Sequence, residues 1–114
     1  MNLYERIRKT RKAKGFTQTD LAEKSGYADK SMIARIENGQ IDIALSKLEN
    51  IADALNVDPA YLMGWTDDAL IEDIEEAFKE LNDEGKEKIC EYARDIVASG
   101  KYKKHDSDSM VGEA

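Results

Sequence analysis

Apolar residues recur every three or four positions along most of this chain, which is the spacing of one face of an α-helix. The pattern predicts helices over about residues 3–14, 18–25, 30–37 and 45–55, and a fifth, short helix after Asp58-Pro59. No segment alternates apolar and polar residues for long, as a half-buried strand would. We therefore expect an all-α fold.

Capping and turn residues bound these predicted helices. Thr17 and Asp29 each precede a helical segment, where a short side chain with an oxygen can accept a hydrogen bond from a free backbone N–H. Gly15, Gly26 and Asn38-Gly39 follow helical segments, at positions where a left-handed residue commonly ends a helix. The residues expected in the core are Leu3, Ile7, Leu21, Ala22, Ile33, Ile36, Leu45, Leu48, Ile51, Ala52 and Leu55, with Thr10 or Arg11 also turned inward.

The sequence changes character after Thr66. Two further helical patterns cover residues 67–81 and 86–99, with a break at Asn82–Gly85, and acidic residues fill the positions between the apolar ones. Residues 101–114 are polar and lack periodicity, which is typical of a disordered tail. We expect three parts: a five-helix head (1–66), an acidic helical hairpin (67–100) and a flexible tail (101–114).

The charges are distributed unevenly between these parts. The chain carries a net charge of −7, which alone would argue against a nucleic-acid partner. Residues 1–40, however, hold nine Lys and Arg against five acids, whereas residues 67–100 hold four against twelve. The basic end can approach phosphates while the acidic end is repelled by them.

The stretch from Phe16 to Gly39 has one apolar and one polar surface. Its apolar residues are spaced to bury against a common core, and its polar residues are spaced to point outward together. The outward set is Gln18, Lys30, Ser31 and Arg35. Arg and Lys can donate to the O6 and N7 atoms of guanine, and Gln can pair with adenine. Two short helices with such a face are suited to the DNA major groove.

Other kinds of site have little support in the sequence. Cys90 and His105 have no metal-ligand companions, so neither a metal site nor a cofactor is expected, and Cys90 is expected to be a small buried residue. The carboxylates at 72–76 are better explained as a solvated helix face than as a catalytic or metal site. No apolar run approaches the roughly 18 residues of a membrane helix. We expect a cytoplasmic protein that is not an enzyme.

A series of landmarks in the first half of the chain follows a known order. They are Phe16-Thr17-Gln18, Leu21-Ala22, Gly26, Ile33, Arg35-Ile36-Glu37-Asn38-Gly39, Leu48-x-x-Ile51-Ala52-x-Ala54-Leu55 and Tyr61-Leu62-Met63-Gly64-Trp65. In these residues the chain resembles the phage-repressor (Cro/XRE-type) helix-turn-helix regulators. The resemblance covers about residues 3–65 and implies a repressor-type DNA-binding head with its helix-turn-helix at about 17–37. One extra residue between Gly26 and Ile33 lengthens the turn, so the recognition helix can begin one position earlier or later.

The resemblance also implies roles for individual residues. The expected DNA contacts are Thr17, Gln18, Lys30, Ser31, Arg35, Asn38 and Gln40, and Arg11 and Glu37 are expected to form a structural ion pair. Each contact has a plainer alternative. Lys30 and Ser31 can be solvated residues at a helix start, and Arg35 can belong to an ion pair within the protein.

One recognition helix buries little surface, so proteins of this kind are expected to bind two half-sites as dimers. The candidate dimerisation residues are Leu70, Ile74, Phe78, Ile89, Tyr92 and Ile96, because two copies of the hairpin can form a four-helix bundle. Alternatively, the hairpin folds back onto its own head. Tyr61, Leu62 and Trp65 are either a second interface or part of the core.

The predicted function is a phage or mobile-element repressor that binds a pseudo-palindromic operator in double-stranded DNA as a homodimer. The chain is too short to hold the self-cleaving peptidase domain of many relatives, which needs about 100 more residues. Induction would then come from an antirepressor or a protease, unless the sequence is a fragment, and contact with RNA polymerase would allow activation. The alternative function is an antitoxin-type or other partner-binding protein whose acidic hairpin binds another protein.

Overall fold

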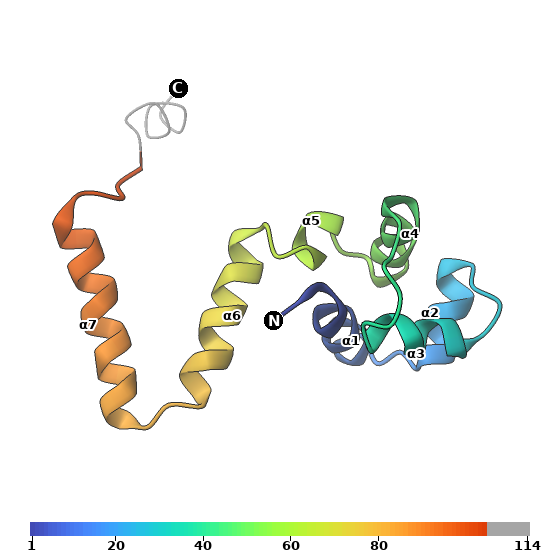
Figure 1. Cartoon of the computed structure of the whole chain (residues 1–114), viewed down its shortest axis with the longest axis horizontal. Helices are drawn as coiled ribbons and strands as arrows, with labels where there is room; N and C mark the ends of the chain where they lie inside the picture. The colour runs from blue at the N-terminus through green and yellow to red at the C-terminus, as the bar shows by residue number, and fades with distance from the viewer. Residues whose placement is uncertain (105–114) are drawn as a thin grey trace. The chain divides into compact units, whose positions relative to one another are not determined.

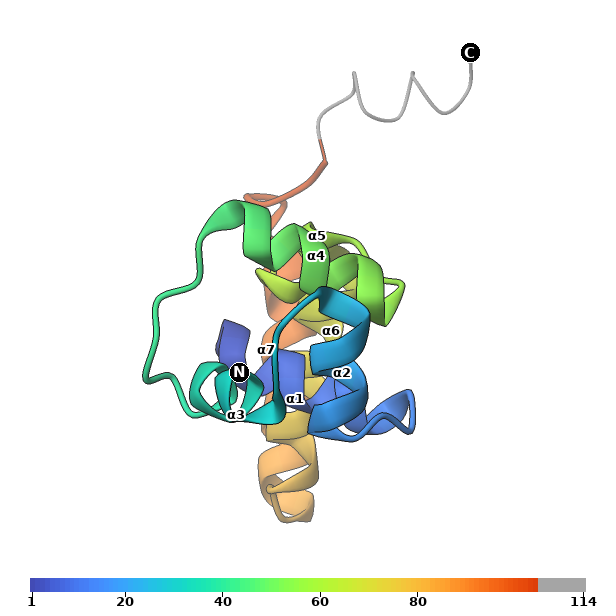
Figure 2. The same cartoon turned by 90° about the vertical axis from the view of Figure 1, so that its right-hand side faces the viewer.

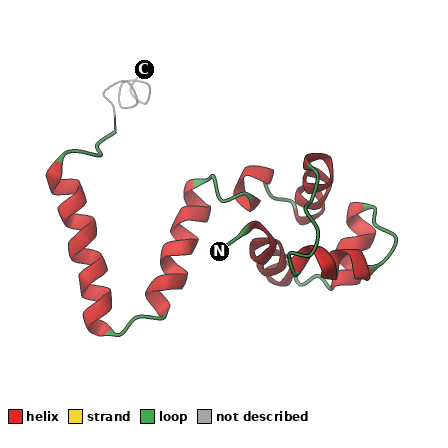
Figure 3. Ribbon diagram, viewed as in Figure 1, coloured by secondary structure: helices red, strands yellow, loops and turns green. Residues whose placement is uncertain are grey.

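The computed structural model describes residues 1–104, in which all regular structure is helical and no strand occurs (Figures 1 and 3). The helices are α1 (Leu3–Ala13), α2 (Gln18–Ser25), α3 (Lys30–Glu37), α4 (Leu45–Leu55), α5 (Pro59–Leu62), α6 (Asp67–Lys79) and α7 (Asp83–Ser99). The prediction of an all-α fold is confirmed. The chain divides into two compact units, Met1–Asp73 and a second that begins at Ile74. We call them the N-terminal and C-terminal units.

Local capping explains where the helices of the N-terminal unit begin. The Asn2 side chain accepts from the backbone N–H of Glu5 at the start of α1, and Asp29 accepts from that of Ser31 at the start of α3. Gly26 ends α2 in the left-handed conformation, with a φ of 85°. The Asp29 cap places the start of α3 at Lys30, after the longer turn.

Helices α1 to α5 enclose a single apolar core. Its buried members are Ile7, Leu21, Ala22, Ile33, Ile36, Leu48, Ile51, Ala52, Leu55 and Leu62. The α2 helix packs on both α3 and α4, and α1 packs on α3 and α5. In Figure 2, α3 continues into the extended loop that leads to α4. Because both short helices of the helix-turn-helix contribute to this core, their outer faces are held in a fixed relation.

The structure corrects one residue expected in the core and decides between core and surface for three others. Leu45 was expected to be buried, but 68% of it is exposed. It is the first residue of α4, one turn before the first buried position at Leu48, so its side chain extends beyond the core. Of the residues assigned to either a core or an interface, Leu62 is fully buried, Tyr61 is half-buried and Trp65 is 73% exposed.

The α6 helix runs from the N-terminal into the C-terminal unit. Thr66 Oγ1 accepts a hydrogen bond from the backbone N–H of Ala69, and the Ala69 side chain is fully buried. The two compact units of the structure divide within α6, after Asp73, whereas the sequence predicts a domain boundary before this helix, at residue 66. The first turns of α6 belong to the N-terminal unit because Glu72 and Asp73 form ion pairs with Arg6, which is far away in the sequence.

The α7 helix begins at Asp83, three residues before the predicted start. Asn82 accepts from the backbone N–H of Gly85, and Asp83 and Glu84 occupy the first turn, where acids complement the helix dipole. Gly85 therefore lies within the helix and is not part of the break. No residue of α7 is buried, so the prediction of a buried Cys90 is wrong and this free thiol is exposed. His105 and most of the predicted tail lie outside the described residues.

Candidate nucleic-acid interface

The start of α2 carries two of the predicted contacts. Thr17 accepts a hydrogen bond from the backbone N–H of Asp20, and the Asp20 carboxylate accepts one from the backbone N–H of Thr17. These hydrogen bonds, the backbone one first, lower the pKa of Asp20. The reciprocal caps leave the N–H groups of Gln18 and Thr19 without an acceptor in the helix, since the first residues of a helix have none.

A shallow depression of about 550 Å³ lies at this helix start. It is lined by Arg11, Gly15, Phe16, Thr17, Gln18, Thr19 and Lys30. The structure thus brings three predicted residues, Thr17, Gln18 and Lys30, to one concave surface. Backbone N–H groups at a helix N-terminus beside a lysine ammonium form an arrangement that binds anions such as phosphate.

The α3 helix exposes a polar face and buries the opposite one. Lys30, Ser31 and Arg35 are exposed, whereas Ile33 and Ile36 are fully buried. The Ser31 hydroxyl also donates to Asp29, and the hydrogen bonds from Ser31 lower the pKa of that carboxyl. The side chains of Lys30 and Arg35 are therefore the cations that α3 presents to solvent.

The buried carboxylate of Glu37, at the end of α3, connects the three helices of the interface. Arg11 Nε donates to its Oε2 atom at 2.7 Å and Arg11 Nη2 to its Oε1 atom at 3.1 Å. Gln18 Nε2 donates to the same Oε1 atom at 3.2 Å. Arg11 Nη1 also donates to the carbonyl of Phe16 at 2.8 Å. The expected Arg11–Glu37 pair is thus present, and it also holds the side chain of Gln18.

A side-chain amide retains further hydrogen-bonding capacity after one such bond. The Gln18 amide group has a second N–H and a carbonyl oxygen, which together match the edge of adenine, whereas the N–H alone can donate to a phosphate. The hydrogen bond to Glu37 therefore orients Gln18 without using up its donors and acceptors.

Arg8 is a functional candidate that the sequence did not single out. Its Nη2 atom donates to Asn38 Oδ1 at 2.8 Å, and its Nε atom lies 3.6 Å from Glu37 Oε1. Asn38, a predicted contact, is thereby held at the end of α3, and the nearby Gln40 is exposed. No local pattern indicates this pairing beyond the position of Arg8 on the predicted first helix, one turn before Arg11 and thus on the same face.

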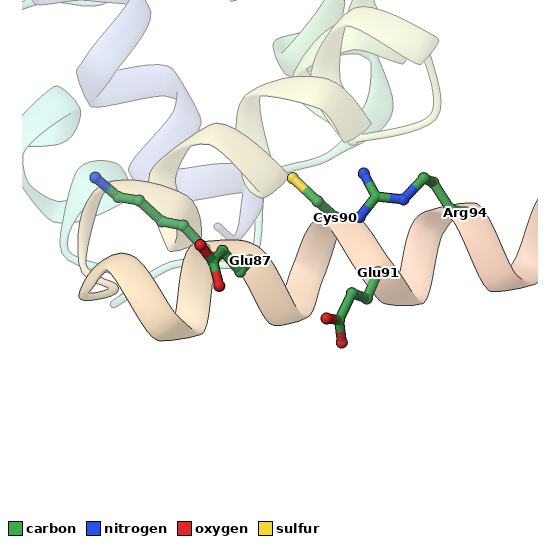
Figure 4. A pocket seen from close by; sticks show the side chains of 5 residues that line it. Glu87, Cys90, Glu91 and Arg94 are labelled. Atoms are coloured by element: carbon green, nitrogen blue, oxygen red, sulfur yellow. The ribbon is translucent and has the colours of Figure 1, made fainter.

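The C-terminal unit offers a second depression, of about 390 Å³, which is formed by one face of α7 alone. Figure 4 shows Glu87, Cys90, Glu91 and Arg94 along that face. Among residues 1–104, no three His, Cys, Asp or Glu side chains are grouped as metal ligands would be. Nor does any helix in the described range have the length and apolarity needed to cross a membrane.

Comparison with known proteins places this arrangement in a family. A family model described as helix-turn-helix matches residues 7–62. The restriction-modification controller protein C.AhdI from Aeromonas hydrophila is 37% identical, over 53% of this chain and 86% of that one, with a TM-score of 0.51. No curated protein matches the chain.

A second solved structure shares the fold. The P22 c2 repressor, in complex with synthetic operator 9T, is 26% identical, over 58% of this chain and 98% of that one, with a TM-score of 0.53. Both similar proteins are regulators, and both are covered over most of their length. The chain therefore belongs to the Cro/XRE-type helix-turn-helix family and is a DNA-binding transcriptional regulator.

Proposed function

We propose that this regulator is a phage or mobile-element repressor that binds a pseudo-palindromic operator as a homodimer, with α3 in the major groove. The observation that carries the proposal is the outer face of α3, where Lys30 and Arg35 are exposed on a helix whose opposite face is buried. Such a helix can enter the groove without unfolding any part of the core.

Each side chain of this face has a role that follows from its chemistry. Arg35, one turn into α3, donates two parallel hydrogen bonds to a guanine, which its planar group fits better than a lysine does. Gln18 contacts an adenine edge or a phosphate through the amide atoms that Glu37 leaves free. Lys30 and the first N–H groups of α2 bind a phosphate at the depression that they share.

The homodimer is proposed on the exposed apolar side chains of α6 and α7. Leu70, Ile74 and Tyr92 are each more than half exposed, and Phe78, Ile89 and Ile96 are only half-buried. They recur at helical spacing on each helix, as in the core positions of a helix bundle. A second copy of the chain covers them and supplies the second recognition helix that a two-half-site operator requires.

Footprinting on the DNA upstream of the chain's own gene, at two salt concentrations, tests the proposal. The expected result is a protected pseudo-palindrome whose affinity falls as salt rises, because phosphate contacts release counterions. Arg35→Ala should weaken binding by about 1–3 kcal/mol and relax the preference at one base pair in each half-site.

Arg94→Ala is the matched control, because it removes the same exposed side chain from α7 and should leave binding unchanged. An equal loss of affinity for every DNA sequence in Arg35→Ala would show that Arg35 contacts phosphate and not a base. Absence of any protected sequence, in a folded protein, would contradict the repressor proposal.

The alternative is an antitoxin-type or partner-binding protein, in which the apolar stripes of α6 and α7 bind a different chain. Sedimentation of the purified protein separates the two possibilities. A dimer at micromolar concentration supports the proposed repressor. A monomer that forms a stoichiometric complex with one protein encoded beside it supports the alternative.

A further inference from the structure

A buried arginine connects α1 to the first turns of α6. Arg6 is 1% exposed, and its Nη1 atom donates to Glu72 Oε2 at 3.2 Å. Its Nη2 atom donates to Asp73 Oδ1 at 3.1 Å. Two ionic hydrogen bonds thus join Arg6 to acids that lie 66 and 67 positions further along the sequence. Neither bond contributes to the proposed DNA contacts.

Tyr61 completes this cluster from α5. Its hydroxyl donates to Glu72 Oε2 at 2.6 Å, and its ring lies under the Arg6 guanidinium, 5.4 Å from ring centre to Cζ. Burial, and next the hydrogen bond to Glu72, raise the pKa of Tyr61. We call Arg6, Tyr61, Glu72 and Asp73 the Arg6 cluster. Arg6 thus engages two adjacent carboxylates on the first turns of α6 at once.

The rotation of α6 matters because the helix has two different faces. Glu72 and Asp73 lie on the side of α6 that contacts α1 and α5, and Ala69, one turn earlier, is buried. At 3.6 residues per turn, Leu70, Ile74 and Phe78 follow one another on another side. These three begin the apolar stripe through which the dimer is proposed to form. Because α6 is one continuous helix, a rotation of its first turns about the helix axis would rotate the stripe as well.

We propose that Arg6 is a positioning residue for operator recognition: it fixes the direction of the α6 stripe, and so sets the half-site spacing that the dimer accepts. The inference rests on the proposed dimeric repressor. In a dimer joined through α6 and α7, the distance between the two α3 helices depends on how rigidly each α6 is held on its own DNA-binding unit. The Arg6 cluster supplies that rigidity with fixed donor and acceptor directions, which apolar contacts alone do not have.

The test measures affinity against spacing with the full chain. Duplexes carry the footprinted half-sites with the spacer shortened or lengthened one base pair at a time, and one duplex carries a single half-site. The proteins are the wild type, Arg6→Met, the double variant Glu72→Gln with Asp73→Asn, and the control Glu75→Gln with Glu76→Gln. The control makes the same charge change at exposed positions of α6.

We expect the wild type and the control to lose about tenfold or more in affinity when the spacer changes by one or two base pairs. Arg6→Met and Glu72→Gln/Asp73→Asn should lose most of that preference. Their affinity for the single half-site and their dimer dissociation constant should stay as in the wild type. A purely structural role of Arg6 would lower the melting temperature without altering the ratio of affinities between spacings.

The remaining outcomes are also decisive. An unchanged spacing ratio in a folded, dimeric Arg6→Met overturns the inference, and so does a wild-type dimer that tolerates every spacing, although the proposed repressor function would then stand. If Arg6→Met does not fold, the Glu72→Gln/Asp73→Asn variant decides, because it removes both ionic partners of Arg6 at part-exposed positions and leaves the buried arginine side chain itself in place. A wild type that is monomeric at the operator overturns the dimeric repressor itself, and this inference with it.

Discussion

The two units of this protein place charged and apolar side chains in opposite ways. The N-terminal unit buries Arg6, Arg11 and Glu37, whereas the C-terminal unit exposes Ile74, Tyr92 and Val97. Buried charges are tolerated only where each has partners, and the N-terminal unit provides those partners from its own helices. Exposed apolar side chains at helical spacing lower the free energy only when another surface covers them. The first unit has an apolar core of its own, whereas no residue of α7 in the second unit is buried.

The largest expected effect comes from removing one of the buried charges. Glu37→Ala leaves the Arg11 guanidinium buried without its carboxylate, which should lower the free energy of unfolding by about 3–5 kcal/mol. Urea denaturation followed by circular dichroism measures it. Glu49→Ala, an exposed acid on α4, is the control and should cost little. A loss in Glu37→Ala no greater than in this control would show that the buried pair contributes nothing.

The next effect tests the exposed apolar residues. Ile74→Asp places a charge within the α6 stripe and should weaken the proposed dimer about ten- to a hundredfold, since burying an isoleucine contributes about 1.5–3 kcal/mol. Analytical ultracentrifugation across a concentration series gives the dissociation constant. Lys79→Asp introduces the same side chain on a different side of α6 and serves as the control. If both variants dimerise like the wild type, the stripe is not the dimer interface.

A smaller effect compares helix caps in the two units. Thr17→Ala removes the cap of α2, whose inner face is in the core, and should lower the free energy of unfolding by about 1 kcal/mol. Asn82→Ala removes the corresponding cap of α7, which buries no residue, and should fray that helix while leaving the unfolding of the N-terminal unit unchanged. Thermal denaturation and amide hydrogen exchange measure the two effects. Equal global destabilisation by both variants would mean that the units unfold together.

The smallest effect concerns alkaline pH. Burial raises the pKa of Tyr61 above the value of about 10 that it has in the unfolded chain, so the folded state holds this proton more tightly. The resulting stabilisation is present below about pH 10 and is lost as the pH rises through the folded pKa. Tyr61→Phe should therefore show a shallower loss of stability above about pH 10 than the wild type. Unfolding curves from pH 8 upward measure it, with the exposed Tyr92→Phe as the control.

Much of the first unit could be predicted because its signals are local. The bounds of α2 and α3 follow from Thr17, Asp29 and the glycine-containing turns, which act within a few residues of themselves. The inward positions follow from helical periodicity in the same way. The sequence also identified the two residues of the Arg11–Glu37 pair through the resemblance.

Two features could not be predicted from the sequence. One is the set of ion pairs between residues far apart in the chain, and the other is the exposure of an apolar helix face. Nothing near Arg6 in the sequence indicates that Glu72 and Asp73 lie beside it, so the division within α6 was missed. Cys90 was expected to be buried because small residues usually are, but among the described residues nothing buries any side chain of α7. Periodicity shows that a residue belongs to an apolar face; it does not show whether that face is covered.

The hydrogen bonds of Glu37 and Arg8 have a consequence for the entropy of binding. Gln18 and Asn38 are already held in place, by Glu37 and Arg8 respectively, so these two proposed contacts lose their rotational freedom when the chain folds. Lys30 and Arg35, the other proposed contacts, extend into solvent and would lose theirs only on binding DNA, at about 0.5–1.5 kcal/mol for each side chain. The protein thus meets DNA with its amides ordered and its cations free, so that the neutral contacts favour a single docking geometry while the charged ones can adapt to it.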